Sequence, residues 1–227
     1  IMSGRLGMSA SSGFMIMGMA TMLMTLITLV ALPDFLVRFI ALICMKLFYR
    51  IKVTGMENVP VKGPALLVSN HVSWVDALLL TATQQRRIRF LMERSIYETW
   101  YLKPLLKLMG VIPISSDDPP KEILRSIKQA REAILQGYMV CIFAEGVVSR
   151  TGMIQNFREG MERIIKGTEA PVIPVYLGGA WGSIFSYAHG RLVSRWPVKL
   201  PYPVTIIFGK PLAAGCNAHD VKQAVED

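Results

Sequence analysis

Seven short apolar runs, separated by turn residues and helical patterns, dominate the chain from residue 50 onward. The runs cover residues 50–54, 65–69, 87–92, 111–115, 139–144, 172–177 and 203–208. Runs of this kind are typical of strands, and strands that alternate with helices predict an α/β fold with a mostly parallel mixed sheet flanked by helices. Because proline cannot donate a hydrogen bond to a sheet, Pro113 and Pro174 predict strands that are edges or carry irregularities.

Two helices are predicted between these strands. The clearest covers residues 120–135, where Pro120 suits the first turn and Gly137 ends the helix. Its apolar face is formed by Ile123, Ile127, Ala130 and Ile134. A second helix is predicted over residues 157–166.

The N-terminal part of the chain has the composition of a membrane segment. Residues 13–32 contain no charged side chain, and about 20 apolar residues suffice to cross a bilayer as a helix. Pro33 and Asp34 then break and recap the chain. Residues 35–49 are apolar with two basic side chains among them, which fits a helix lying in the membrane interface. A secretory signal is the less favoured alternative, because the run is long and no small-residue cleavage site follows it.

These patterns divide the chain into four parts. They are a transmembrane segment over 1–33, an interfacial helix over 34–50, an α/β domain over 51–215 and the start of a C-terminal helix over 216–227. The chain begins with Ile1 and stops at Asp227 inside a helix-like pattern. We therefore interpret it as a piece of a longer polypeptide.

The composition favours a lipid partner. The chain is 52% hydrophobic and 18% charged, with a formal net charge of +9. A basic and apolar protein is expected to meet anionic lipid rather than nucleic acid. Basic residues are denser after residues 13–32 than before them, so the positive-inside rule places the rest of the chain on the cytoplasmic side of the inner membrane. Cys44, Cys141 and Cys216 show no disulfide framework and no metal-ligand spacing.

Residues 180–202 combine aromatic and basic side chains. The residues concerned are Trp181, Phe185, Tyr187, Arg191, Arg195, Trp196 and Lys199. Aromatic rings with cations nearby suit the headgroup region of a bilayer. The equal alternative is a loop-rich segment that packs its aromatic rings inward.

His71 and Asp76 follow the buried run 65–69 and predict a general base. Residues five apart in one helix point about 140° away from each other, so this pair can meet only if His71 lies in the loop before a helix. Ser73 is a suitable N-cap, which would put Asp76 at the third helical position. A carboxylate that orients an imidazole makes the base half of a catalytic triad. The alternative is that Asp76 only caps the helix and His71 is structural.

A second polar motif, residues 143–150, follows the run 139–144 in the same way. Sites in open α/β sheets gather at the carboxyl ends of strands, so two such motifs predict one shared site. Gly146 permits close backbone approach. Glu145 is expected either to accept hydrogen bonds from a polyol or to hold a nearby loop, and a solvated side chain is the plainer alternative.

Three motifs in this order resemble a known family. They are Asn70-His-x4-Asp76, Phe143-x-Glu-Gly146 and Val172-Ile-Pro-Val175. Over roughly residues 36–215 the chain resembles the glycerolipid acyltransferases typified by 1-acylglycerol-3-phosphate acyltransferases. The resemblance implies that His71 is the general base, that Asp76 is its partner and that the Glu145–Gly146 region helps to bind the acyl acceptor. It also implies that the two N-terminal helices dock the enzyme on membrane lipids.

The implied reaction moves an acyl group from acyl-CoA or acyl carrier protein to the hydroxyl of a lysophospholipid, with no metal and no bound cofactor. The tetrahedral oxyanion needs hydrogen-bond donors, which we expect from the backbone N–H groups of residues 71–74. Asn70 and Ser73, on either side of the base, are added to the predicted substrate-binding residues.

The chain departs from the family pattern where that pattern supplies cations. Ala144, Val147 and Val148 stand where the family usually has Pro, Thr and Arg, and Glu93 stands where it often has Lys. Residues 115–118 are acidic where an Arg is common. Such cations would clamp a phosphate dianion, so their loss favours an acceptor whose phosphate already bears a headgroup. The cations left as replacement clamps are Arg94, Arg150 and Arg158.

A closer resemblance fits that acceptor. The run Glu145-Gly-x4-Thr-Gly152 is similar to the acyltransferase part of bifunctional 2-acylglycerophosphoethanolamine acyltransferase/acyl carrier protein synthetases. Some relatives of those enzymes are fused behind a lysophospholipid transporter, and residues 1–33 would then be the transporter's last span. The losses at 144, 147 and 148 also motivate an alternative from another class, a catalytically idle module for membrane docking or linked to a transporter.

Overall fold

The computed structural model describes residues 9–31, 33–190 and 200–227, and these form two compact units that divide between Phe39 and Ile40. In the first unit, α1 (Ala10–Ala31) carries no charged side chain. Its residues Ala10–Thr28 are long and apolar enough to cross a membrane. The second apolar helix, α2 (Pro33–Phe48), begins at the proline predicted to break the chain.

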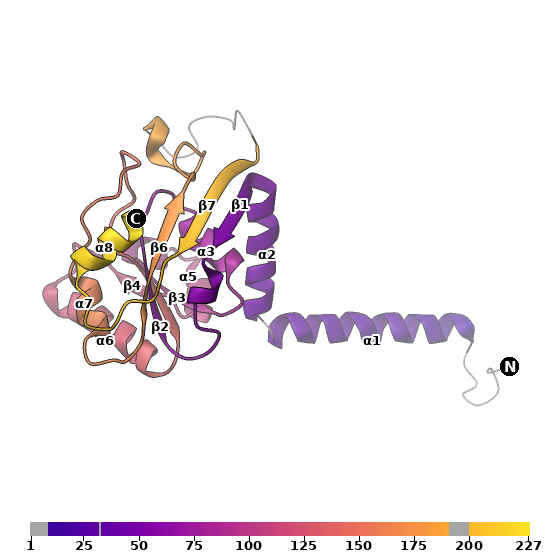
Figure 1. The fold of residues 1–227 in the computed structure, drawn as a ribbon. Helices are drawn as coiled ribbons and strands as arrows, with labels where there is room; N and C mark the ends of the chain where they lie inside the picture. Colours follow the sequence, from indigo (N-terminus) through magenta and orange to yellow (C-terminus); the bar gives the residue numbers. More distant parts are fainter. Residues whose placement is uncertain (1–8, 32, 191–199) are drawn as a thin grey trace. The chain divides into compact units, whose positions relative to one another are not determined.

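The second unit is built on a seven-stranded sheet, and all seven predicted strands are present (Figure 1). The strands are β1 (Tyr49–Thr54), β2 (Ala65–Ser69), β3 (Ile88–Glu93), β4 (Ile112–Ile114), β5 (Met139–Phe143), β6 (Val172–Gly178) and β7 (Tyr202–Phe208). Their order is β1-β7-β6-β2-β5-β3-β4. Every pair is parallel except β6 with β7, which confirms the mostly parallel mixed sheet.

Helices cover both faces of this sheet and give it two apolar cores. One core packs α2 and α3 (Asp76–Thr83) on the sheet. The other packs α6 (Pro120–Leu135), α7 (Gly160–Ile165) and α8 (Ala218–Glu226) on the opposite face. Strand β2 serves both cores, because Ala65 and Leu67 belong to the first and Leu66 and Val68 to the second. A strand buried on both faces reads as an unbroken apolar run, as this one does.

The two prolines that the sequence singles out, Pro113 and Pro174, sit where a sheet tolerates them. Pro113 lies in β4, which is the edge strand next to β3. Pro174 lies inside the sheet, but the register of the antiparallel pair shifts beside it. Val175 pairs with Phe208, whereas Val172 pairs with Leu212, so three steps on one strand oppose four on the other. Such a bulge is the irregularity that the sequence predicts.

Helix boundaries show where sequence reasoning was less accurate. The helix over 120–135 has the predicted bounds, whereas the one predicted over 157–166 is shorter, Gly160–Ile165. Ser73 is not an N-cap, because α3 begins at Asp76 with Val75 before it. The predicted C-terminal helix begins with a capping box between Asn217 and Asp220. Four short helices were not predicted: η1 (Met56–Asn58), α4 (Arg94–Tyr97), α5 (Lys103–Leu108) and η2 (Tyr187–His189).

Candidate active site

His71 and Asp76 meet as the sequence predicts, in the loop between β2 and α3. The distance from His71 Nδ1 to Asp76 Oδ2 is 2.9 Å. The same Oδ2 also accepts hydrogen bonds from the backbone N–H groups of Val72, at 2.7 Å, and Ser73, at 2.9 Å. The carboxylate is fully buried. Asp76, the first residue of α3, therefore orients the imidazole and also holds the loop that precedes the helix, without forming a capping box.

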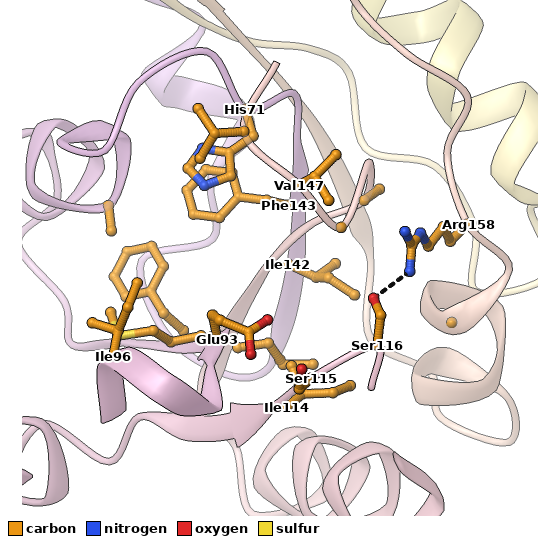
Figure 2. Close-up of a pocket in the computed structure, with 18 of the residues that line it drawn as sticks. His71, Glu93, Ile96, Ile114, Ser115, Ser116, Ile142, Phe143, Val147 and Arg158 are labelled. Atoms are coloured by element: carbon orange, nitrogen blue, oxygen red, sulfur yellow. Dashed lines mark hydrogen bonds between the residues drawn. The ribbon is translucent and has the colours of Figure 1, made fainter. Parts of the chain in front are cut away.

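The imidazole ring lies between the protein and a large cavity. One face stacks on Phe143 at the end of β5, with ring centroids 4.1 Å apart and ring planes 16° from parallel. Figure 2 shows this stack at one side of the cavity, with the ring at the cavity wall. Because Nδ1 is engaged with Asp76, Nε2 is the nitrogen left for a substrate. A neutral imidazole that donates from Nδ1 accepts a proton at Nε2.

Three of the predicted substrate-binding residues support the loop from behind and are not part of the cavity wall. The side-chain amide of Asn70 donates to the carbonyl of Leu177 and accepts from its N–H, at 2.9 and 2.7 Å. Glu145 accepts from the backbone N–H groups of His71, at 2.8 Å, and Gln155, at 3.2 Å. The Ser73 hydroxyl donates to the carbonyl of Phe185 at 3.2 Å. Of the two interpretations of Glu145, the loop-holding one matches these contacts.

Burial changes the titration of two groups around the site. Desolvation raises the pKa of the Glu145 carboxyl, and the backbone donors of His71 and Gln155 oppose that rise. Desolvation also raises the pKa of Tyr49 to about 12. Tyr49 is therefore a neutral hydrogen-bond donor, and its hydroxyl donates to Ser183 Oγ at 3.1 Å.

The sequence did not predict that residues 183–187 hold the loop that carries His71. The carbonyl of Phe185 accepts from the N–H of Trp74 at 3.0 Å, in addition to the Ser73 hydroxyl. Tyr187 lies edge-on to Trp74, with ring centroids 6.3 Å apart. Phe185 itself packs against the first core, which favours the inward-packing alternative for this residue. Backbone carbonyls leave no signal in a sequence, so this contact had none to find.

Of the other aromatic residues named in the prediction for 180–202, only Trp181 lies among the described residues. Trp181 packs against Gly152, where a Cβ atom would lie 2.7 Å from the indole. The remaining residues of that prediction, Arg191, Arg195, Trp196 and Lys199, lie outside the described residues.

The cavity has a volume of about 790 Å³, which is the size of a site for a drug-sized or larger ligand. Its lining is mostly apolar, with Phe90, Ile96, Ile114 and Ile142 among the lining residues. Figure 2 places Glu93, Ser115 and Ser116 at the side away from His71. The cavity thus has an imidazole at one side, polar side chains at the other and a mostly apolar lining.

Cations do line the cavity, although not at the positions of the family pattern. Arg158 donates to Ser116 Oγ at 2.7 Å and lies over Gly146, whose φ is 73° and whose missing Cβ would be 2.8 Å from Arg158 Nε. Arg150 lies 5.6 Å from the ring centroid of Tyr187. Arg163, which was not predicted, also lines the cavity.

Arg94 has a different role in the structure. It makes two hydrogen bonds to the carboxylate of Asp118, at 2.8 and 3.0 Å, and it is not among the residues that line the cavity. This pairing lowers the pKa of Asp118. The acidic stretch after β4 therefore has its own counter-ion.

The expected oxyanion donors are already engaged. The N–H of His71 donates to Glu145, those of Val72 and Ser73 donate to Asp76, and that of Trp74 donates to Phe185. The expectation that residues 71–74 supply these donors was therefore wrong. The N–H groups of Val147 and Val148, by contrast, donate to none of the residues that the structure describes, and both residues line the cavity.

No group of three or more candidate metal ligands occurs within the described residues.

Comparisons with known proteins match the same part of the chain. The chloroplastic 1-acyl-sn-glycerol-3-phosphate acyltransferases of Brassica napus and Arabidopsis thaliana are each 30% identical over 166 residues, which is 73% of this chain but 46% and 44% of theirs. The 1-acyl-sn-glycerol-3-phosphate acyltransferase of Pseudomonas aeruginosa is 27% identical over 169 residues. The chain thus spans less than half the length of the chloroplastic relatives.

A solved structure and a family model complete the comparison. The crystal structure of the 1-acyl-sn-glycerophosphate acyltransferase of Thermotoga maritima superposes with a TM-score of 0.68 and 19% identity, covering 85% of this chain and 76% of that one. This likeness confirms the fold. The family model described as "Acyltransferase" matches residues 50–178. That match covers more than half of the chain and includes His71, Asp76 and the β5 motif, so the chain belongs to the acyltransferase family.

Proposed function

We propose that the protein transfers a fatty acyl group from an acyl thioester to the free hydroxyl of a lysophospholipid, in the synthesis or repair of glycerophospholipids. The observation that carries this proposal is the His71–Asp76 pair, 2.9 Å apart, with the imidazole on the wall of a cavity whose lining is mostly apolar. The imidazole suits an alcohol that must lose its proton, and the apolar lining suits an acyl chain. The relatives named 1-acyl-sn-glycerol-3-phosphate acyltransferases support acyl transfer to a glycerol phosphate.

In the proposed reaction His71 Nε2 takes the proton of the acceptor hydroxyl as that oxygen attacks the thioester carbonyl. The new C–O bond forms, the C–S bond then breaks, and the thiolate leaves with the proton returned from Nε2. Asp76 keeps the proton on Nδ1 throughout, which holds the ring in the tautomer that the reaction needs. No enzyme nucleophile is required, because the acceptor brings its own hydroxyl.

The oxyanion of this reaction needs donors on the cavity wall. The N–H groups of Val147 and Val148 are suited to this task, since they line the cavity and donate to no described residue. Preorganised backbone donors of this kind are worth a factor of about 10²–10³ each. Their freedom also explains how Val can stand at both positions, because a backbone donor does not depend on the side chain.

The acceptor is proposed to be 2-acylglycerophosphoethanolamine or 1-acylglycerol-3-phosphate. Relatives carry the second name. The first is favoured by Val148, Glu93 and the acidic stretch after β4, which stand where the family pattern has cations. A phosphodiester carries one negative charge fewer than a phosphomonoester dianion, so it needs fewer clamps. Arg150 and Arg158 are the proposed clamps for its phosphate.

The location proposed is the inner, cytoplasmic membrane. Helix α1 has the length and composition of a span. Arg50 and Lys52 follow it closely in the chain, which supports a cytoplasmic position for the catalytic unit. Acyl-CoA and acyl carrier protein, the two candidate donors, are both acidic, and the net charge of +9 suits either.

An acceptor panel tests the proposal. Purified full-length chain is incubated with a labelled acyl thioester, as CoA and as carrier-protein ester, and with lysophosphatidate or lysophosphatidylethanolamine in mixed micelles. We expect labelled diacyl product that His71→Ala abolishes and His219→Ala, a change at an exposed histidine on α8, leaves unchanged. The absence of labelled product with every acceptor and both donors would instead support the catalytically idle module.

A further inference from the structure

The connection between β3 and β4 carries an exposed apolar surface that the proposed reaction does not use. We define the α5 surface as Trp100, Tyr101, Leu105 and Leu108, which are 84%, 63%, 42% and 47% exposed. Scattered single apolar side chains are ordinary on a protein surface, but four large ones within nine residues mark an interaction site.

Helical geometry brings these side chains onto one face. The N–H groups of Leu102 and Lys103 donate to the carbonyl of Thr99, so the helical turn starts before α5 itself. Tyr101, Leu105 and Leu108 then follow the spacing i, i+4, i+7, which is one helix face. Trp100 stands edge-on to Tyr101, with ring centroids 5.6 Å apart. Met109 faces inward and is buried.

The charges around this face select the partner. Lys103 and Lys107 lie one turn apart on α5, and Arg87 donates to the carbonyl of Leu108 at 3.4 Å, at the end of the same helix. Glu98 pairs with Lys103. Lys107 has no carboxylate partner among the described residues, so this face carries an excess positive charge and favours an anionic surface. Tryptophan and tyrosine with lysines beside them are the side chains that concentrate at membrane interfaces.

We propose that the α5 surface docks onto a bilayer surface that contains anionic phospholipid, as a membrane contact separate from α1. The exposed aromatic rings would sit at the level of the headgroups, and the two lysines would meet anionic lipid.

This contact has a consequence for the cavity. Ser95 and Ile96 of α4, a few residues before Trp100, line the cavity that holds His71. Docking therefore brings that rim of the cavity to the membrane surface, where lysophospholipid resides. This last step rests on the proposed function, whereas the docking does not.

Depth-dependent fluorescence quenching tests the docking with the full chain in vesicles. Nitroxide lipids quench tryptophan near the headgroups or deeper, and subtracting the signal of Trp100→Phe isolates Trp100. The matched control is Leu135→Trp in the Trp100→Phe background, since Leu135 is an exposed leucine at the end of α6. We expect Trp100 to be quenched severalfold more strongly than Trp at 135, most by the shallow nitroxide.

The dependence of Trp100 quenching on lipid charge and on the two lysines gives a second test. Replacing phosphatidylglycerol with phosphatidylcholine, or introducing Lys103→Gln and Lys107→Gln, is expected to lower the docking constant about fivefold per lysine. Equal quenching at 100 and 135 overturns the proposal. It is also overturned if Trp100 is shielded from all nitroxides and Leu105→Glu converts a dimer to a monomer, because a second copy would then cover the surface.

An activity measurement keeps docking and chemistry apart. Trp100→Glu with Leu105→Glu is expected to lower turnover of vesicle-borne lysophospholipid about tenfold and to leave turnover of a short-chain, water-soluble acceptor unchanged. An equal loss with both acceptors contradicts the proposed consequence of docking. If the unmodified chain is inactive with both, the proposed function fails while the quenching result still decides the docking.

Discussion

The loops that leave β2 and β5 lie side by side and are built in opposite ways. In the β2 loop all four backbone N–H groups from His71 to Trp74 have partners, and the motif has the letters of the family pattern. In the β5 loop the N–H groups of Val147 and Val148 have none among the described residues, and three letters of the motif differ. The rigid loop holds His71, the proposed base, and the open loop faces the cavity.

Two hydrogen bonds join these loops into one site. The N–H of His71 donates to Glu145 Oε1, and the N–H of Ser149 donates to the carbonyl of His71, each at 2.8 Å. His71 is thus held by the Glu145 side chain and by the N–H of Ser149, whatever side chains the β5 loop carries at 147 and 148. This difference explains how the chain can depart from the family pattern in one loop and keep the geometry of the other.

The contrast between the two loops fails if His71 in the β2 loop is not needed for activity. His71→Ala removes the proposed base and is expected to lower kcat by about 10³-fold or more, because general acid–base groups typically contribute 10²–10⁴. The fold should persist, because the ring is partly exposed and its loop is held through the backbone. Steady-state kinetics and circular dichroism of the variant check both points. More than a tenth of the original turnover would remove His71 from the mechanism.

Asp76→Asn tests whether the carboxylate both orients His71 and holds the β2 loop. In the wild-type chain, Asp76 Oδ2 binds three donors. The asparagine oxygen can take the place of Oδ2 only if its NH₂ group takes the place of the other carboxylate oxygen and faces other atoms. We expect kcat to fall about 10²–10³-fold through the wrong imidazole tautomer, together with a lower melting temperature. Kinetics and thermal denaturation separate this from His71→Ala, which should leave the melting temperature nearly unchanged. An active, fully stable Asp76→Asn protein would contradict both proposed roles of the carboxylate.

The open loop is tested through Arg158. Arg158→Gln keeps a donor for Ser116 and removes the charge, so KM for a lysophospholipid is expected to rise about tenfold with a small change in kcat, as for one lost charge-assisted contact. Arg94→Gln is the matched control, since Arg94 is paired with Asp118 and does not line the cavity. Equal effects of the two variants would show that charge near the sheet edge, and not the cavity wall, sets KM.

How much of this site the sequence predicts depends on the kind of contact. The seven strands follow from apolar runs, and the meeting of His71 and Asp76 follows from their spacing and the strand before them. The helix start was misplaced by two residues, because Asp76 bonds to Val72 and Ser73 instead of leaving Ser73 to cap the helix. Patterns of side chains do not show which backbone groups a carboxylate will choose.

Contacts made by backbone atoms far away in the chain were beyond prediction. The carbonyl of Phe185 holds Trp74 across more than a hundred residues, and no residue type marks it. Of the three cations predicted as phosphate clamps, Arg150 and Arg158 line the cavity, whereas Arg94 pairs with Asp118 of the acidic stretch. Counting cations does not reveal which of them are already paired.

Burial of Glu145, which joins the two loops, makes stability depend on pH. Burial raises the pKa of Glu145, so the folded chain holds that proton more tightly than the unfolded chain. The stability contributed by this group is therefore full below its unfolded pKa and is lost as pH rises through the folded value. We expect the melting temperature of the original chain, compared with that of Glu145→Gln, to decline as pH increases from about 4.3. A difference that is constant across pH would show that the carboxyl is not buried as described.

The smallest expected effect concerns the far side of the rigid loop. Tyr49→Phe removes one neutral hydrogen bond to Ser183 and should lower the free energy of unfolding by about 1 kcal/mol. Because Ser183 belongs to the segment that holds Trp74, kcat should fall only a fewfold, with KM unchanged. Tyr202→Phe is the control, since Tyr202 packs against Tyr49 from β7 with ring centroids 5.9 Å apart. If Tyr49→Phe lowered kcat as much as Asp76→Asn, the loop's rigidity would depend on the 183–187 segment more than on the carboxylate, and the comparison of the two loops would have to include this third one.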